Sequence, residues 1–220
     1  MIKAVILDMD GTIVDSEVLH FDAYSRVMDA FGKKITKDDY WRLWGTDTDM
    51  CERFVLEFRL AITSEELLEL KNKTFREDSL PKIKTRHGLL ELLKNLKKDG
   101  YLLAVASSSQ AHEIKVVLEN LKITRFFNQV ASAESVKYGK PAPDIYLLAA
   151  KSLNVQPEDC LVLEDAPQGV LAAKSAGMKC FAIPSQEIKD QDFSKADKVL
   201  DNLEEVYHLL KNSLRELNKF

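Results

Sequence analysis

The chain opens with a short apolar segment that ends in two carboxylates. Residues 4–7 are four consecutive apolar residues without alternation, a pattern typical of a strand buried on both faces. Asp8 and Asp10 follow where this strand should end. Because strand side chains repeat every two residues, both carboxylates can point to the same side, and Gly11 can take the turn. The pattern predicts charge at the edge of a buried sheet.

Two other interpretations of this stretch have to be compared with a functional site. Asp-Gly is ordinary turn chemistry after a strand, and for the stretch alone this alternative stays open. A calcium-binding loop would need glycine at its sixth position and glutamate at its twelfth. Counted from Asp8, those positions hold Ile13 and Leu19. The calcium loop is therefore excluded.

The rest of the chain divides into two parts with different sequence patterns. Residues 15–80 show helical periodicity and no convincing strand, whereas from residue 81 onward helical segments alternate with apolar strands. The expected strands are 101–106, 129–131, 160–163, 180–183 and 199–200. This alternation predicts an α/β fold, a Rossmann-like doubly wound parallel sheet with helices on both faces. We expect a core domain of residues 1–14 and 81–220, with a helical cap domain of residues 15–80 inserted in it.

Composition favours a small-molecule partner. With 31 Lys and Arg against 35 Asp and Glu, the formal charge of −4 gives no reason to expect nucleic acid or an anionic membrane as partner. The three cysteines, Cys51, Cys160 and Cys180, show no Cys-x-x-Cys spacing and are interpreted as buried thiols. No apolar run approaches the roughly 20 residues of a membrane span, and the start has no signal-peptide core. We expect a cytoplasmic monomer.

Polar side chains follow two further strands. Ser107 comes after the strand at 101–106, and Glu164 with Asp165 after the strand at 160–163. Taken alone, Ser107 is better explained as a helix cap. The second acidic pair, however, repeats the arrangement at the first strand, and parallel sheets bind ligands beyond the carboxyl ends of their strands. A few carboxylates that leave positions for water and phosphate describe a magnesium site.

In this order the motifs resemble those of the haloacid dehalogenase-like phosphotransferases, in particular the phosphatases and phosphomutases close to β-phosphoglucomutase. Each motif is weak alone, but the ordered set is specific, and residues 15–80 fall where this family inserts a cap domain. The matching elements are Asp8-Met9-Asp10-Gly11-Thr12 for the nucleophile, Ser107 for phosphate, Lys140-Pro141 for the basic element and Glu164-Asp165 for the metal. The resemblance covers nearly the whole chain.

The resemblance implies a magnesium-dependent phosphatase that acts on a small phosphorylated metabolite, most simply a sugar phosphate. Asp8 would be the nucleophile that forms an aspartyl-phosphate, and Asp10 the general acid and base. The metal would be bound by Asp8, the backbone carbonyl of Asp10 and Asp165, with Glu164 as a less certain ligand that could act through water. Halide leaves without a proton, so an acid at position 10 argues against dehalogenation.

Phosphate and charge would be handled by three further residues. Ser107 would donate to a phosphate oxygen, together with the backbone amide of Ser108. Lys140 would offset negative charge on nucleophile and phosphate. Lys137 is its competitor, but prolines 141 and 143 stiffen the chain after Lys140 and favour it.

Substrate choice in this family lies with the cap. The expected substrate loop contains Trp44, Gly45 and Thr46. β-Phosphoglucomutases carry a lysine just before this glycine and an arginine shortly after it, where this chain has Trp44 and then Asp47 or Thr48. Loss of both cations argues for hydrolysis, because a mutase must hold a bisphosphate. A phosphomutase is the alternative, and a non-catalytic metabolite-binding protein a weaker one.

Two cap side chains have open roles. Trp44 could stack on a sugar face, although a tryptophan in a helical cap is more often part of the core. His20, on the first cap helix, could assist Asp10 or could be a packed histidine without a catalytic role.

Overall fold

The computed structural model describes residues 1–43, 50–186 and 188–217. By contacts the chain divides into two compact units, Met1–Asp15 with Thr85–Phe220, and Ser16–Lys84. These boundaries lie one and four residues later than the sequence predicted. The second differs because a short 3-10 turn, Leu80–Lys82, continues the helical segment before it.

Six parallel strands form the sheet of the first unit, in the order β3-β2-β1-β4-β5-β6. The strand β1 lies between β2 and β4 and pairs with both along its whole length. All four of its residues are fully buried, as its continuous apolar pattern predicted. The strands are β1 (Ala4–Leu7), β2 (Leu102–Ala106), β3 (Gln129–Ala131), β4 (Cys160–Glu164), β5 (Lys179–Ala182) and β6 (Lys198–Val199). The predicted doubly wound α/β fold is confirmed.

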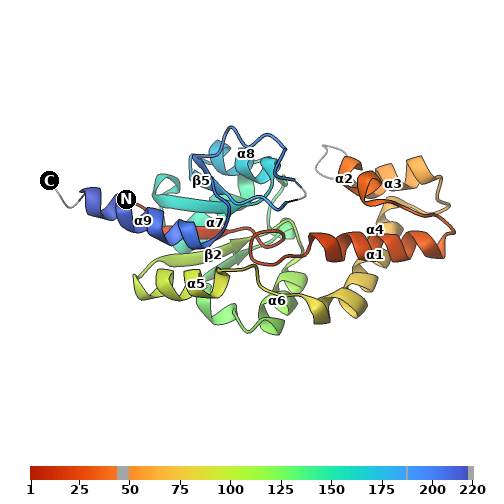
Figure 1. The fold of residues 1–220 in the computed structure, drawn as a ribbon, viewed down its shortest axis with the longest axis horizontal. Coiled ribbons are helices and arrows are strands. Elements are labelled where there is room, and N and C mark those ends of the chain that lie inside the picture. The colour runs from red at the N-terminus through yellow and green to blue at the C-terminus, as the bar shows by residue number, and fades with distance from the viewer. Residues whose placement is uncertain (44–49, 187, 218–220) are drawn as a thin grey trace. The chain divides into compact units, whose positions relative to one another are not determined.

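Helices cover both faces of this sheet (Figure 1). The helices α5 (Leu89–Lys98) and α6 (Ala111–Asn120) lie on one side, and α7 (Asp144–Leu153) and α8 (Pro167–Ser175) on the other. The last helix, α9 (Glu204–Leu217), packs against α5. The apolar stripe of α5 explains its position, because its four leucines at i, i+3, i+4 and i+7 are all buried. Three 3-10 turns complete the unit: Thr124–Phe126, Ala133–Ser135 and Pro157–Asp159.

The second unit is helical. Its helices are α1 (Glu17–Ala30), α2 (Lys37–Leu43), α3 (Met50–Phe58) and α4 (Ser64–Thr74), followed by a π-helical turn, Phe75–Ser79. The described residues of this unit contain no strand. Two capping boxes begin helices of this unit, because Thr36 and Asp39, like Thr63 and Glu66, exchange hydrogen bonds between side chain and backbone.

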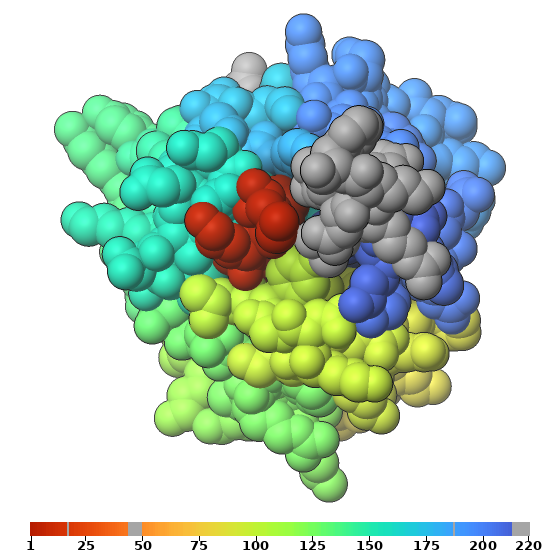
Figure 2. All heavy atoms as spheres, turned by 90° about the vertical axis from the view of Figure 1, so that its left-hand side faces the viewer, coloured from red at the N-terminus to blue at the C-terminus, as the bar shows by residue number. Residues whose placement is uncertain are grey.

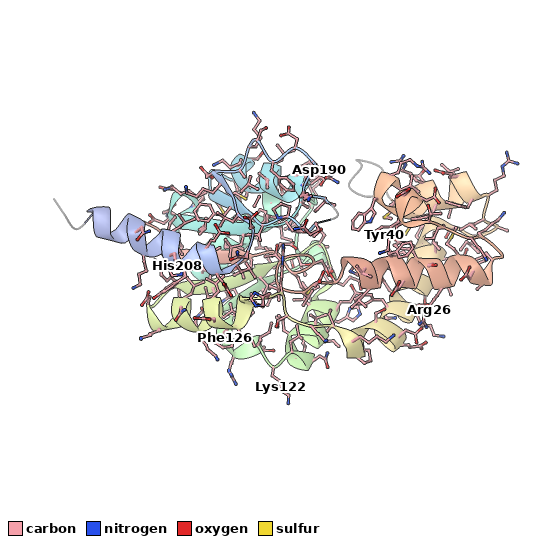
Figure 3. The ribbon with its side chains drawn as sticks, in the orientation of Figure 1. Arg26, Tyr40, Lys122, Phe126, Asp190 and His208 are labelled. Atoms are coloured by element: carbon pink, nitrogen blue, oxygen red, sulfur yellow. The ribbon has the colours of Figure 1, made fainter. Side chains whose placement is uncertain are left out.

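An aromatic cluster forms the core of the helical unit. Tyr40 of α2 is buried and labelled in Figure 3. Its ring makes an edge contact with Phe21 and lies 6.0 Å from that of Tyr24, which stacks on Phe54. Such ring pairs add about 0.5–1.5 kcal/mol each beyond the area they bury. This unit therefore has a hydrophobic core of its own.

Both chain crossings between the units pass one point of the first unit. Val14 makes a bridge with Asp10 on one side and an antiparallel bridge with Thr85 on the other. The next residue, Arg86, donates its backbone N–H to the carbonyl of Ile13 at 2.9 Å. The chain thus leaves and re-enters the first unit through adjacent backbone segments.

The opposite end of the sheet carries the chain start. Figure 2 shows the first residues, in red, at the surface. The Met1 amine and the Lys3 ammonium both bind the carboxylate of Asp159, at 3.1 and 2.5 Å, which lowers the pKa of Asp159. Within the described residues, no helix has the length and apolar character needed to cross a bilayer. All three cysteines are buried free thiols, as predicted.

Candidate active site

The carboxyl ends of three adjacent strands bring the predicted site residues together. Asp8 follows β1, Ser107 follows β2, and Glu164 is the last residue of β4, with Asp165 next to it. Because Leu7 pairs with Val105 on one side and with Leu163 on the other, these ends lie level with one another. All four polar side chains are buried. The edge of the sheet therefore holds a cluster of buried polar groups, as expected for a doubly wound fold.

Lys140 lies at the centre of this cluster. Its ammonium donates to the carboxylate of Asp8, to Oε1 of Glu164 at 2.7 Å and to the carbonyl of Ala106 at 3.3 Å. Its side chain is 9% exposed. An ammonium has three N–H donors, so each of them has a protein acceptor. The competing Lys137 is exposed, and its ammonium lies over the ring of Tyr138 instead.

Both oxygens of Glu164 are engaged inside the protein. Oε1 accepts from Lys140 and, at 2.5 Å, from the phenol of Tyr146. Oε2 accepts from the backbone N–H groups of Asp165 and Ala166, at 3.0 and 3.1 Å. Four bonds occupy the four lone-pair directions of a carboxylate. In this arrangement Glu164 is an anchor for Lys140 and does not fit a direct metal ligand.

Two glycines make room for the acidic side chains. Gly11 has a φ of +76°, and a Cβ there would collide with the carboxylate of Asp165. Gly169, in the first turn of α8, would collide in the same way with Glu164. The loop after β1 and the start of α8 thus approach the two carboxylates more closely than any other residue type would allow.

Charge in the cluster is unbalanced. Burial raises the pKa of the Asp8 carboxyl to about 8; Glu164 and Asp10 add to this effect and Lys140 opposes it. Burial disfavours the Lys140 ammonium, but Asp8 and Glu164 outweigh it and raise the pKa of Lys140 above its ordinary value. Burial, with Glu164, also raises the pKa of Tyr146, which keeps the phenol a donor. The cluster holds one lysine and several carboxylates. A further cation nearby would therefore lower the pKa of Asp8 and favour its ionised form.

The residues left for that cation are hard oxygen donors. Within the described parts of the chain, no three His, Cys, Asp or Glu side chains surround a common metal position. Asp8 and Asp165 remain, together with backbone carbonyls such as that of Asp10. One or two carboxylates, with other positions open to water and phosphate, are the set that Mg²⁺ prefers. The donors therefore fit a small hard dication.

The serines after β2 form a small network. The hydroxyl of Ser107 accepts from the N–H of Ser109 at 3.0 Å, and the hydroxyl of Ser109 donates to Oδ2 of Asp10 at 3.1 Å. Ser108, between them, is exposed. Because a hydroxyl can accept and donate at once, Ser107 keeps its proton for an acceptor outside this turn.

The predicted cap residues lie outside the described residues or belong to the helical unit. Trp44, Gly45 and Thr46 lie outside the described residues. His20 belongs to the helical unit, where its ring stacks on Phe75 with the centroids 4.3 Å apart.

Three residues of the site were not predicted from sequence. Tyr146 and Ser109 contact Glu164 and Asp10 as described above. Arg86 donates to the carbonyls of Gly11, Ile183 and Pro184, and so joins the loop after β1 to the loop after β5. These contacts could not be predicted from local sequence, because the partners lie far apart in the chain. Arg86 and Gly11 are 75 residues apart, and Ser109 and Asp10 are 99 residues apart. The sequence marks Tyr146 only by its position at the start of α7, two residues after Asp144.

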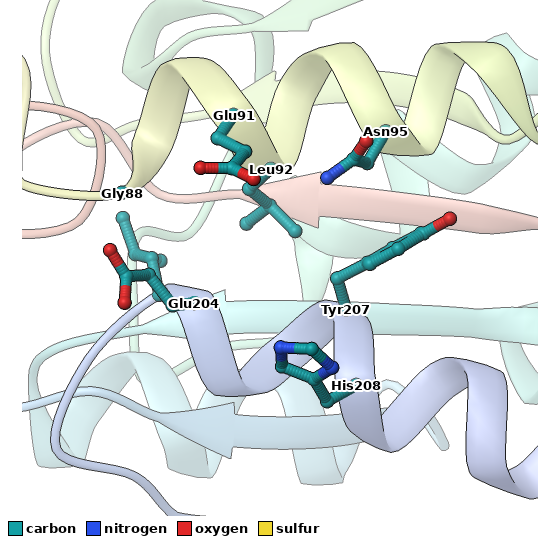
Figure 4. Close-up of a pocket in the computed structure, with 8 residues that line it drawn as sticks. Gly88, Glu91, Leu92, Asn95, Glu204, Tyr207 and His208 are labelled. Carbon is teal, nitrogen blue, oxygen red and sulfur yellow. The ribbon is translucent and has the colours of Figure 1, made fainter.

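A separate cavity of about 260 Å³ lies between α5 and α9 (Figure 4). It contains none of the predicted site residues. Its lining residues are Gly88, Glu91, Leu92, Asn95, Leu203, Glu204, Tyr207 and His208.

Comparison with known proteins defines the class. The family model described as haloacid dehalogenase-like hydrolase matches residues 5–183. This match includes every strand-end residue of the cluster. The chain therefore belongs to the haloacid dehalogenase-like hydrolases, and the predicted family is confirmed.

Individual relatives narrow the comparison. The phosphorylated carbohydrates phosphatase of Thermotoga maritima is 36% identical over 182 residues, 80% of this chain and 82% of the relative. β-Phosphoglucomutase of Bacillus subtilis is 34% identical over 195 residues, 82% of each chain. The crystal structure of CbbY from Rhodobacter sphaeroides in complex with phosphate superposes with a TM-score of 0.83 at 29% identity and covers 94% of this chain and 96% of that one. These relatives confirm the predicted enzyme class, a phosphohydrolase of this family.

Proposed function

We propose that this protein is a magnesium-dependent phosphatase that hydrolyses a small phosphorylated metabolite, a sugar phosphate, through an aspartyl-phosphate. The observation that carries the proposal is the buried contact of Lys140 with Asp8 at the end of β1. Ser107 and Asp165 lie at the two neighbouring strand ends. The phosphatase relatives support the reaction class.

Asp8 starts the reaction. One oxygen of its carboxylate attacks phosphorus, the bond from phosphorus to the substrate oxygen breaks, and the electron pair stays on that oxygen. Asp10 gives the leaving oxygen a proton. In the second half, a water oxygen attacks the phosphoryl group, Asp10 takes a proton from this water, and the Asp8 carboxylate is restored. Two easier displacements replace one difficult displacement.

The remaining residues hold the phosphoryl group and its charge. Asp8, Asp165 and the backbone carbonyl of Asp10 would hold Mg²⁺, which when bound offsets the repulsion between nucleophile and phosphate. Lys140 keeps positive charge beside Asp8. The hydroxyl of Ser107, with the amide of Ser108 before the start of α6, donates to phosphate oxygens. Glu164 holds Lys140, and as a metal ligand it would act only through water.

Substrate choice is assigned to the helical unit of residues 16–84. Trp44, Gly45 and Thr46 are proposed to contact the substrate, with His20 as an accessory residue. The phosphorylated carbohydrates phosphatase supports a sugar phosphate. A phosphomutase is the second candidate, favoured by the identity to β-phosphoglucomutase but opposed by the missing lysine and arginine of the cap loop. We also propose that the protein is a cytoplasmic monomer, in line with its three free thiols.

The test is phosphate release from a panel of sugar phosphates, phosphoglycolate and nucleotides, with and without Mg²⁺. Asp8→Asn should lower release at least about 100-fold, and Asp190→Asn, which removes the same charge from an exposed loop, should not. Calorimetry should show that Mg²⁺ binds more weakly to the Asp8→Asn variant. No release from any substrate, or full activity of Asp8→Asn, contradicts the phosphatase. Interconversion of sugar phosphates faster than release would establish the mutase.

A further inference from the structure

Ser109 connects Asp10, the proposed general acid, with Ser107, the proposed phosphate-binding residue. Its hydroxyl donates to Oδ2 of Asp10 at 3.1 Å, and its N–H donates to the hydroxyl of Ser107 at 3.0 Å. Its carbonyl is held as well, because the N–H of Ala133 donates to it at 3.1 Å. Hydrogen bonds thus hold both the N–H and the carbonyl of Ser109. Its side chain bonds Asp10, which lies 99 residues away in the sequence.

We propose that Ser109 is the positioning residue of Asp10, which sets the carboxyl of the general acid relative to the phosphate-binding hydroxyl of Ser107. The inference rests on the proposed function, since it gives Asp10 a partner for that reaction. A carboxyl on a two-bond side chain has several staggered rotamers, and a hydrogen bond from a fixed neighbour selects among them. In this role Ser109 acts through Asp10 and not on the substrate.

The chemistry gives this role a signature. When an alkoxide leaves, it needs the proton from Asp10 as its bond to phosphorus breaks. A nitrophenolate leaves without that proton, because its charge spreads over the ring. The value of kcat/KM reports events up to transfer of the phosphoryl group to Asp8, before water is used. A misplaced Asp10 therefore lowers kcat/KM for alkyl phosphates and spares it for aryl phosphates.

The experiment compares Ser109→Ala with the parent enzyme on a sugar 6-phosphate and on p-nitrophenyl phosphate. We expect kcat/KM for the sugar phosphate to fall about tenfold, part of the roughly 100-fold or more that a positioned acid supplies, while kcat/KM for the aryl ester stays within about twofold. Ser109→Thr, which keeps the hydroxyl, should restore most of the loss. In an Asp10→Asn background, Ser109→Ala should change kcat/KM for the sugar phosphate no further.

A matched control is Ser135→Ala. Ser135 is exposed and shares a hydrogen bond of 2.9 Å with Ser132, on the loop after β3. Its loss should leave the ratio of the two kcat/KM values unchanged. Activity of Ser109→Ala on the aryl ester shows that the variant is folded.

The inference and the proposed function fail in different ways. Equal losses on both esters would make Ser109 a phosphate-binding or structural residue and overturn the inference, as would additive losses in the double variant or no loss on either ester. A parent enzyme that releases no phosphate from either ester would overturn the proposed function instead.

Discussion

The ammonium of Lys140 lies 2.7 Å from Oε1 of Glu164 and at the same time bonds the carboxylate of Asp8. One cation therefore joins the ends of β1 and β4. Removal of one member of a buried ion pair leaves the other charge buried and uncompensated. This costs more stability than the intact pair contributes. This relationship gives the site its sharpest test.

Lys140→Ala should abolish activity and destabilise the fold. Removal of the ammonium leaves Asp8 and Glu164 facing each other, so we expect about 3–5 kcal/mol less stability and a loss of phosphate release of at least about 100-fold. Urea unfolding and a phosphate assay measure the two effects. Lys137→Ala is the matched control, and it should change stability by about 0.5 kcal/mol or less because Lys137 is exposed. A larger effect of Lys137→Ala on activity would reverse the assignment.

Gly11→Ala should displace Asp165. Gly11 and Gly100 both have positive φ, +76° and +82°, but a Cβ meets the Asp165 carboxylate only at Gly11 and finds open space at Gly100. Each variant should lose about 1–2 kcal/mol through backbone strain. Only Gly11→Ala should also weaken Mg²⁺ binding in calorimetry, by about tenfold or more, because displacement of a group that holds a metal site in place typically costs that much affinity. Equal Mg²⁺ affinity in the two variants would remove Asp165 from the ligand set.

Tyr146→Phe should lower stability by removal of one buried hydrogen bond. The phenol donates to Glu164 at 2.5 Å, and the ring itself is retained in the variant. We expect a loss of about 1–3 kcal/mol, seen as a fall in Tm of several degrees. Tyr138→Phe is the control, since Tyr138 is 56% exposed. If both variants have the same Tm as the parent, the hydroxyl of Tyr146 does not stabilise Glu164.

Asp197 should contribute to stability at neutral pH and lose this contribution in acid. Its partial burial would raise its pKa, but Lys174 at 2.6 Å and the N–H of Cys180 at 2.7 Å outweigh burial and lower the pKa. A carboxyl with a lowered pKa in the folded state stabilises above its unfolded value of 3.8 and loses this effect as pH falls through the folded value.

The measurement compares Asp197→Asn with the parent by urea unfolding at several pH values. The parent should be more stable at pH 6, and the difference should shrink below about pH 4. Asp190→Asn removes the same formal charge from an exposed loop and serves as the reference. A difference that stays constant between pH 6 and pH 3 would contradict the ion pair.

The fold was largely predictable because local pattern and burial agree. Strand β1 shows why: its four apolar residues without alternation are fully buried between two parallel neighbours. The same holds for α4, whose cap pair of Thr63 and Glu66 lies three residues apart and can be recognised locally. By contacts the helical unit ends at Lys84, four residues after the expected boundary, because the 3-10 turn Leu80–Lys82, which carries little periodicity, continues its helical segment.

The contacts of the site were less predictable, because they depend on register and not on local pattern. The acidic pair at 164 and 165 was visible in the sequence, but its two members look alike there. In the structure they face different neighbours, Glu164 toward Lys140 and Tyr146, and Asp165 toward Gly11. Which carboxylate meets the lysine depends on where the folded chain places Lys140 and Tyr146, far from residues 164 and 165 in the sequence.

The bridge between Val14 and Thr85 has a consequence for how such a protein can change over time. Because backbone bridges hold the two crossings side by side, the two ends of the inserted segment stay together whatever the length of chain between them. Loop-closure entropy grows slowly, about 0.6 kcal/mol for each doubling of length. Insertions, deletions or wholesale exchange of residues 16–84 therefore cost the sheet little. Under the proposed function, selection can remodel substrate preference there while β1 and the proposed nucleophile Asp8, which follows it, stay untouched.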